Sequence, residues 1–142
     1  MIVDGAKKLK RAVSEGDVEL SPDANALAVS IGQAFIARRY GDVHALGTPP
    51  FQKRTSRESF EQSWRATIGE RVLTGFSITD AGGIDLGYVP GLEEVDQEDF
   101  VGFAQITFST PQSKLEDDKA FAIAAVLLDH NGTVRLGALH AR

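Results

Sequence analysis

One histidine is the residue of this chain best suited to proton transfer. An unperturbed imidazole titrates at about pH 6.5, so His140 could act as a general base. His140 shares strand parity with Leu136 and Ala138, which predicts that its side chain points into the protein. A single histidine at such a position is more often a satisfied or exposed residue. We therefore predict no catalytic residue and keep His140 as a candidate base.

Five side chains are candidates for the lining of a ligand pocket: Tyr40, Trp64, Tyr88, Gln105 and His140. Tyr88 shares the parity of the apolar residues before it and could bring its hydroxyl to the same cavity as His140. Gln105 lies on an otherwise apolar strand face, where an unpaired buried amide costs about 1–3 kcal/mol. Its amide should therefore be exposed or hydrogen-bonded, for example to a ligand.

Several other chemistries are excluded by composition or spacing. The chain has no cysteine, which excludes disulfides, thiol catalysis and thiolate metal sites. Its three histidines, His44, His130 and His140, show no metal-binding spacing, and no P-loop or GxSxG motif is present. Residues 129–132 resemble a fragment of a calcium loop, but the glycine offset is wrong, so a hairpin turn is the better interpretation. We predict no metal and no cofactor.

Charge is distributed unevenly along the chain. The net charge is −5, and residues 72–142 hold most of the acids, five of them within 93–99. This acidic half argues against nucleic acid as a partner, because phosphate binding needs clustered Lys and Arg. The run 93–99 could face a basic partner, although such a run is usually a solvated loop. A basic set in the helical half is interpreted as solvated helix ends rather than an anion site; it comprises Arg38, Arg39, Lys53, Arg54 and Arg57.

Hydropathy predicts that the protein does not enter a membrane. No run approaches the roughly 18 apolar residues that a spanning helix needs, and the first 20 residues are charged throughout. We therefore expect a cytoplasmic protein without membrane contact. Its length of 142 residues suits one domain, assigned to 21–142, preceded by an N-terminal arm or short helix over 1–20.

Three helices should position the first candidate residues. Ser21 is a good N-cap for a helix over 21–42, whose apolar stripe recurs every four residues and which Gly41 should end. A short helix then starts near Asp42, and Pro49-Pro50 forbids its continuation and makes a corner. A capping box that starts at Thr55 predicts a third helix over 56–68, with Trp64 on its apolar stripe.

About five antiparallel strands should follow, over 72–78, 84–88, 100–109, 119–128 and 133–141. Helices followed by strands without alternation predict an α+β fold. Two of the strands, 100–109 and 119–128, are apolar on both faces and need two covers. The helices supply one. The second is predicted to be the sheet of another subunit, because Ala120, Ala122 and Ala124 would permit close approach, which makes the protein a homodimer.

Two segments carry a resemblance to a known superfamily. They are AFIARRYGDVHAL at 34–46 and SRESFEQSW at 56–64. With the strands in this order, residues 21–142 resemble the NTF2-like superfamily, a cystatin-like α+β cone, and within it small bacterial domains of unknown function. The resemblance implies three helices packed on a curved sheet, a pocket between the opening helix and the sheet, and dimerisation through the outer sheet face.

The same resemblance leaves the function open, since this fold hosts enzymes, carriers and immunity proteins alike. Ketosteroid-isomerase-like members use a carboxylate base with a tyrosine and a protonated acid, for which the nearest residues here are Tyr40 and Asp85. Asp85 should face away from the core, because its neighbours Ile84 and Leu86 face inward. We expect noncatalytic binding of a small molecule or peptide in the cone pocket. The alternatives are a small lyase or isomerase and a protein-interaction or immunity-type module.

Overall fold

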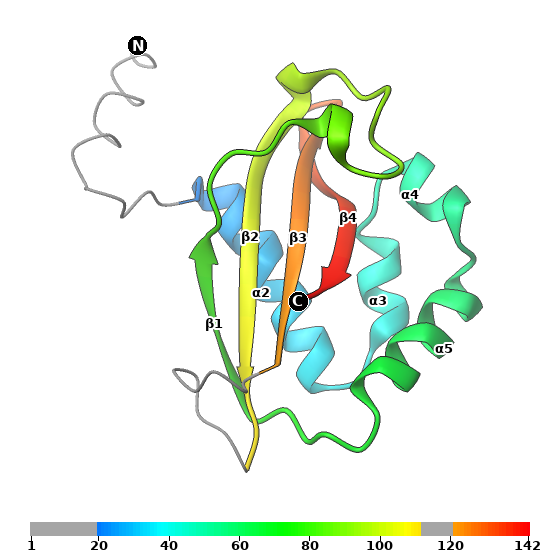
Figure 1. Ribbon diagram of the computed structural model, residues 1–142, viewed down its shortest axis with the longest axis vertical. Helices are drawn as coiled ribbons and strands as arrows, with labels where there is room; N and C mark the ends of the chain where they lie inside the picture. The colour runs from blue at the N-terminus through cyan, green and yellow to red at the C-terminus, as the bar shows by residue number, and fades with distance from the viewer. Residues whose placement is uncertain (1–19, 112–120) are drawn as a thin grey trace, which may run out of the picture.

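The computed structural model describes residues 20–111 and 121–142, which form an α+β fold as predicted. Four helices come first: α2 (Pro22–Ile36), α3 (Tyr40–Ala45), α4 (Pro49–Arg54) and α5 (Arg57–Ile68). Four strands follow: β1 (Gly75–Asp80), β2 (Phe100–Ser109), β3 (Phe121–His130) and β4 (Thr133–Ala141). In Figure 1, α2 crosses behind the strands, and α3, α4 and α5 lie beyond β4. The predicted N-terminal arm lies outside the described residues, apart from Leu20.

The opening helix begins as predicted but ends earlier. The Ser21 hydroxyl accepts a hydrogen bond from the Ala24 amide at 3.2 Å, which caps α2. The helix ends at Ile36 because Arg38 adopts a left-handed conformation with φ of 60°, and the Arg39 amide then bonds back to the Ala34 carbonyl at 2.8 Å. The prediction that Gly41 ends this helix was therefore wrong. Gly41 lies inside α3.

The predicted corner at two prolines is a helix. Thr48 caps α4 by accepting from the Phe51 amide at 3.2 Å, and both prolines occupy the first turn, where their missing N–H groups cost nothing. The next helix, α5, is capped by Ser56 rather than Thr55, and it ends at Ile68 as predicted, with Gly69 as its C-cap. The described residues thus contain four α-helices where three were predicted.

All strands of the sheet run antiparallel, in the order β1-β2-β3-β4. Asn131 and Gly132 both have positive φ, which confirms the predicted two-residue hairpin between β3 and β4. The strand predicted over 84–88 is wrong. These residues belong to a loop over 81–99, in which Asp85 caps a 3-10 turn at Leu86–Tyr88, so the described residues form four strands rather than five.

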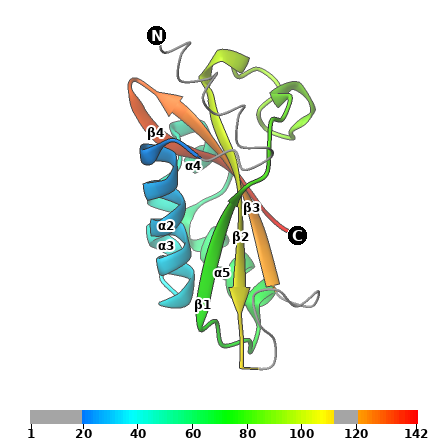
Figure 2. The ribbon, with the colours of Figure 1, turned by 90° about the vertical axis from the view of Figure 1, so that its left-hand side faces the viewer.

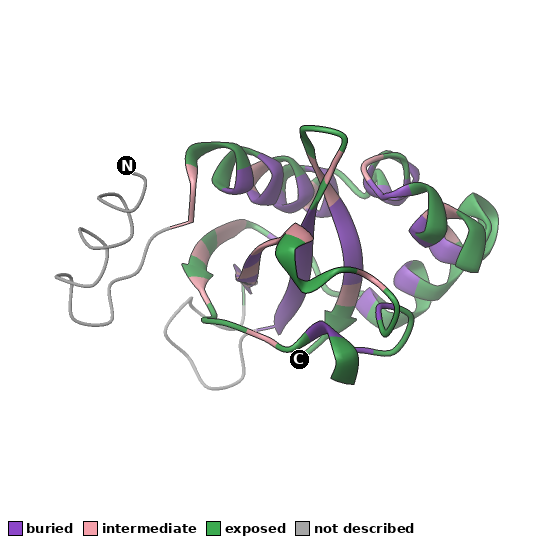
Figure 3. Cartoon of the chain, turned by 90° about the horizontal axis from the view of Figure 1, so that it is seen from above, coloured by how far each residue is buried: buried purple, intermediate pink, exposed green. Residues whose placement is uncertain are grey.

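The main core lies between α2 and one face of the sheet. Ile31 and Phe35 of α2 are fully buried, as are Ile106 and Phe108 of β2. Figure 2 shows α2 lying along one side of the twisted sheet. Figure 3 shows the buried residues on the sides of the helices that face the strands, with exposed residues outside. The predicted stripe of the opening helix is therefore the wall of the core that faces the sheet.

A second, smaller core lies on the opposite face of the sheet. The loop 81–99 packs Leu86, Val89 and Leu92 against Val126 and its neighbours on β3 and β4. At this end of the sheet, the second cover is the chain's own loop, where another subunit was predicted. A single chain does not test the homodimer, which stays a prediction. No helix of the described ranges is long and apolar enough to cross a membrane.

Candidate functional site

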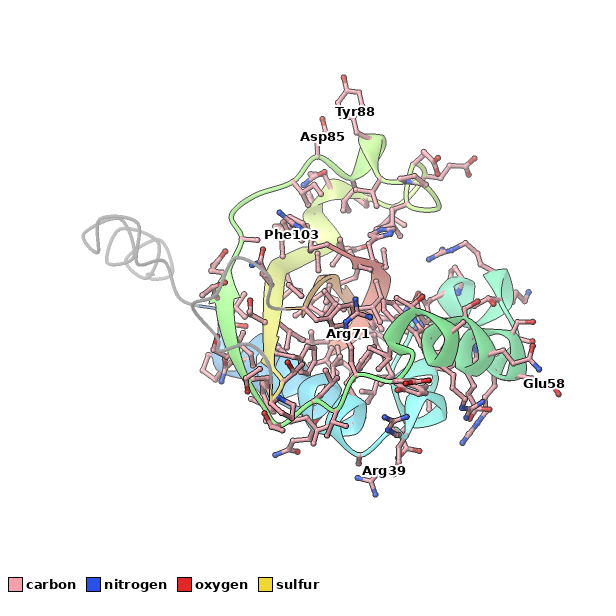
Figure 4. All side chains as sticks on the ribbon, turned by 60° about the horizontal axis from the view of Figure 1, so that its bottom comes forward. Arg39, Glu58, Arg71, Asp85, Tyr88 and Phe103 are labelled. Atoms are coloured by element: carbon pink, nitrogen blue, oxygen red, sulfur yellow. The ribbon has the colours of Figure 1, made fainter. Side chains whose placement is uncertain are left out.

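The five predicted pocket residues do not line one cavity. Tyr40 and Trp64 are in the main core, with exposures of 1% and 8%, and both rings contact Phe35, at centroid distances of 5.4 and 5.0 Å. Tyr88 lies on the loop 81–99 and is 86% exposed. Its side chain projects away from the sheet (Figure 4), so the prediction that it shares a cavity with His140 was wrong.

His140 faces outward because β4 contains a bulge. Val126 pairs with Ala138 but Leu127 pairs with Leu136, so the pairing register shifts by one residue at Gly137. Leu136 therefore packs in the main core, whereas Ala138 packs under the loop 81–99 on the other face. This shift reverses the alternation of faces beyond Gly137. The prediction that His140 points inward was therefore wrong, and His140 is exposed.

Gln105 lies on the same outer face as His140. Both residues pair with Ala124, which separates them on the sheet. The Gln105 amide donates to the Thr107 hydroxyl at 3.4 Å on a half-buried surface. This contact gives the amide a partner within its own strand. The structure thus brings Gln105 and His140 onto one face but gives them no contact with Tyr40 or Trp64.

The loop 81–99 differs from its sequence prediction, which was a strand over 84–88 and a solvated acidic run over 93–99. A connection of this length is uncommon in a compact domain and is usually functional or disordered. Here it has a defined conformation. Gln97 ties its two halves together, because its side-chain oxygen accepts from the Leu86 amide at 2.8 Å and its nitrogen donates to the Ile84 carbonyl at 2.9 Å. Asp85 accepts from the Gly87 amide at 2.9 Å and fixes the turn that carries Tyr88.

An arginine from the helical half anchors the same loop. Arg54, in the last turn of α4, donates to the Gly91 carbonyl at 3.1 Å and to the Gly137 carbonyl at 2.6 Å. Its guanidinium also lies over the Phe51 ring, 5.7 Å from the centroid. One side chain thereby links α4, the middle of the loop and the bulge of β4. The loop is fixed at both ends and in the middle, so its outer surface is preorganised.

The outer surface of the loop is acidic. The segment 81–99 contains no Lys, Arg or His, and its acids are Asp85, Glu93, Glu94, Asp96, Glu98 and Asp99. All of these except Asp99 are exposed. The ion pairs found among residues 20–111 and 121–142 join Arg39 to Asp42 and Arg57 to Glu61, so none neutralises the loop. Among the described residues, Arg54 is the cation that reaches the loop, at Gly91, so the segment keeps a net negative charge.

An open depression lies at the base of this surface. It is lined by Gly83, Ile84, Asp85, Gln97 and Phe100, so its lining is largely apolar and includes one carboxylate. In Figure 4, Asp85 and Tyr88 project from neighbouring points of the loop. Within the described part of the chain, no group of three or more His, Cys, Asp or Glu side chains could hold a metal ion. The absence of metals and cofactors stays a prediction.

Comparison with protein-family models, with curated proteins and with solved structures finds no match for this chain. The NTF2-like resemblance therefore stays a prediction.

Proposed function

We propose that the protein is a noncatalytic binding domain that recognises a basic, extended segment of a partner protein through its loop 81–99. One observation carries the proposal. A long loop that is fixed by Arg54 and Gln97 presents an 86% exposed tyrosine, Tyr88, on a segment whose six acids form no ion pair with the described residues. Ordering such a loop costs conformational entropy, and a surface formed in advance reduces the entropy lost on binding.

Tyr88 is suited to be the anchor of such an interface. Tyrosine supplies a large apolar ring and a hydroxyl for few rotatable bonds, and it is enriched among the residues that dominate binding energy. Leu86, the first residue of the turn, and Val89, the residue after it, are buried at 1% and 5% exposure and hold the turn on the sheet. The ring is therefore presented from a fixed backbone.

The exposed acids of the loop select the partner. Exposed carboxylates attract Lys and Arg side chains and speed the encounter, and they repel acidic competitors. The depression adds a place for one such side chain. Ile84 and Phe100 in its lining suit the aliphatic stem of a lysine or arginine, and the Asp85 carboxylate suits its charged head. A basic peptide matches both features.

The lyase or isomerase alternative gains no support from the placement of its residues. Tyr40 is in the main core, Asp85 is on the exposed loop, and His140 is on the outer face of β4. These groups share no cavity within the described residues, so a base and an oxyanion donor are not brought together. We also propose an NTF2-like relationship, which the order of helices followed by strands supports. A cytoplasmic homodimer is a separate part of this proposal.

A selection from a library of short random peptides tests the proposed function. We expect the peptides that bind to be rich in Lys and Arg and to bind more weakly as salt concentration rises. Tyr88→Ser should weaken binding roughly 30-fold, as expected for an interface anchor worth about 2 kcal/mol.

Two charge variants complete this test. Glu94→Gln on the loop should weaken binding, whereas Glu58→Gln should not. Glu58 is an exposed acid at the start of α5, far from the loop in Figure 4, so both variants lose one negative charge. Selection of acidic or uncharged peptides, or equal effects of the two variants, would contradict the proposal.

A further inference from the structure

The two edges of the sheet differ in what covers them. The order β1-β2-β3-β4 makes β1 and β4 the edge strands. The chain before α4 covers β4, because the Thr48 amide donates to the Leu136 carbonyl and the Leu136 amide donates to the Leu46 carbonyl, both at 2.9 Å. No segment of residues 20–111 and 121–142 pairs with the outer side of β1. Figure 1 shows β1 on the side of the sheet away from α3, α4 and α5.

The backbone of β1 presents hydrogen-bonding groups to this open edge. The Ala81 amide donates to the Phe103 carbonyl at 2.7 Å, which continues the antiparallel pairing of β1 with β2. Backbone groups of such a strand point alternately toward the neighbouring strand and away from it. Those of Phe76, Ile78 and Asp80 therefore point away from β2. A row of such groups is a template for the addition of another strand.

The edge strand β1 lacks the features that usually prevent strand addition. Proteins commonly protect an open edge with lysine, proline or a β-bulge. The strand sequence GFSITD contains no Lys, Arg or Pro, and its pairing with β2 runs from Gly75 to Asp80 without a shift of register. The outer side of β1 is therefore suited to accept an extended segment of another protein.

The apolar side chains of β1 are incompletely covered at the same edge. Phe76 and Ile78 pack against the main core but are half-buried, whereas Phe108 and Ile106, their partners on β2, are fully buried. Side chains of neighbouring strands that lie on one face contact each other. A strand beside β1 would thus cover Phe76 and Ile78 with side chains from every second residue. Those side chains should be apolar.

The open edge leads into the depression of the loop 81–99. β1 ends at Asp80, whose carboxylate accepts from the Gly82 amide at 2.7 Å, and the next residue, Gly83, lines the depression. In Figure 1 the chain runs on from β1 toward this loop. At about 3.3 Å per residue, an extended segment paired with β1 reaches the depression with roughly three more residues. The same segment can therefore place a basic side chain beside Asp85.

We propose that the basic segment recognised by the loop 81–99 adds to the open edge of β1 as a further strand and places a Lys or Arg side chain in the depression. This inference rests on the proposed function and specifies how the partner binds. Backbone hydrogen bonds to β1 hold the segment, and its alternate apolar side chains cover Phe76 and Ile78. The Asp85 carboxylate selects its basic end. The partner segment is therefore extended, apolar at every second residue and basic at one end.

Amide hydrogen exchange of the full chain, with and without a Lys- and Arg-rich peptide selected from the random library, tests strand addition. In the free protein, the amides of Phe76 and Ile78 should exchange faster than those of Ser77 and Thr79, which point to β2. Saturating peptide should slow exchange at Phe76 and Ile78 roughly tenfold or more. Unchanged exchange there, with a peptide that still shifts the Tyr88 signals, would overturn strand addition and leave the proposed function standing.

Two N-methylated versions of the same peptide provide a matched comparison. One carries methyl groups on its odd-numbered backbone nitrogens and the other on its even-numbered ones. Only every second N–H of an added strand faces β1, so one version should bind roughly tenfold or more weakly than the other. Equal affinity of the two versions would overturn strand addition. If no Lys- and Arg-rich peptide is selected at all, the proposed function fails, and this inference fails with it.

Discussion

Replacing Tyr40 by phenylalanine should stabilise the protein. The ring is kept, and its hydroxyl is buried without a hydrogen bond, so the variant leaves no partner unpaired. An unsatisfied buried polar group costs about 1–3 kcal/mol, and most of that cost should be recovered. With the urea dependence typical of small domains, the midpoint should rise by about 0.5–1 M. The direction is unusual, because most substitutions at buried sites destabilise.

Urea unfolding measured by Trp64 fluorescence and by circular dichroism provides the assay. The matched control is Tyr88→Phe, which removes the same hydroxyl from an 86% exposed ring and should change stability by less than about 0.5 kcal/mol. A loss of stability of about 1 kcal/mol or more in Tyr40→Phe would refute the reasoning. It would mean that the hydroxyl forms a hydrogen bond in the folded protein.

Three further predictions concern titration, helix packing and the anchor of the loop. Because burial raises the pKa of Tyr40, the unfolded state should ionise first above about pH 10, so stability should fall as pH rises from there. Unfolding at about pH 9 and pH 11 should show the gap between Tyr40→Phe and wild type widening, and a constant gap would contradict this. Gly32→Ala should destabilise the protein despite a helix-propensity gain of about 1 kcal/mol, because the alanine Cβ would lie 2.7 Å from the Phe76 ring. Thermal unfolding shows whether the melting temperature falls, as predicted, or rises. Arg54→Met should speed amide exchange in 89–92 more than in α2, because the bond to the Gly91 carbonyl is lost, and uniform exchange across both segments would count against the anchoring role.

Local rules predicted the parts of the fold that depend on adjacent residues. Ser21 caps its helix, and Asn131-Gly132 forms its hairpin turn, because both conformations follow from the side chains involved. The end of α2 could not be read in the same way. A glycine or asparagine usually occupies the left-handed position at the end of a helix, but here Arg38 occupies it. The nearest glycine, Gly41, therefore gave the wrong prediction for the helix end.

The candidate site depended on contacts between distant residues. The bulge at Gly137 moves His140 to the outer face. The alternation of apolar residues along β4 does not predict this bulge. Arg54 reaches Gly137, 83 residues away, and thereby fixes a loop that the sequence alone presents as a solvated acidic run. The alternation of Ile84, Leu86 and Tyr88 suits a strand, but Asp85 caps a turn there. The sequence identifies the acids themselves. It does not predict that the loop carrying them is fixed, because the hydrogen bonds of Arg54 join residues far apart in the chain.

Amide NMR spectra recorded during titration with a selected Lys- and Arg-rich peptide test the central claim most directly. If the loop 81–99 is the binding surface, the largest shifts should fall within 84–98, and the ring protons of Tyr88 should shift with them. Residues on the outer sides of α2 and α5 should change little. Shifts concentrated on those helices, with unchanged signals from Tyr88 and its neighbours, would contradict the proposed function.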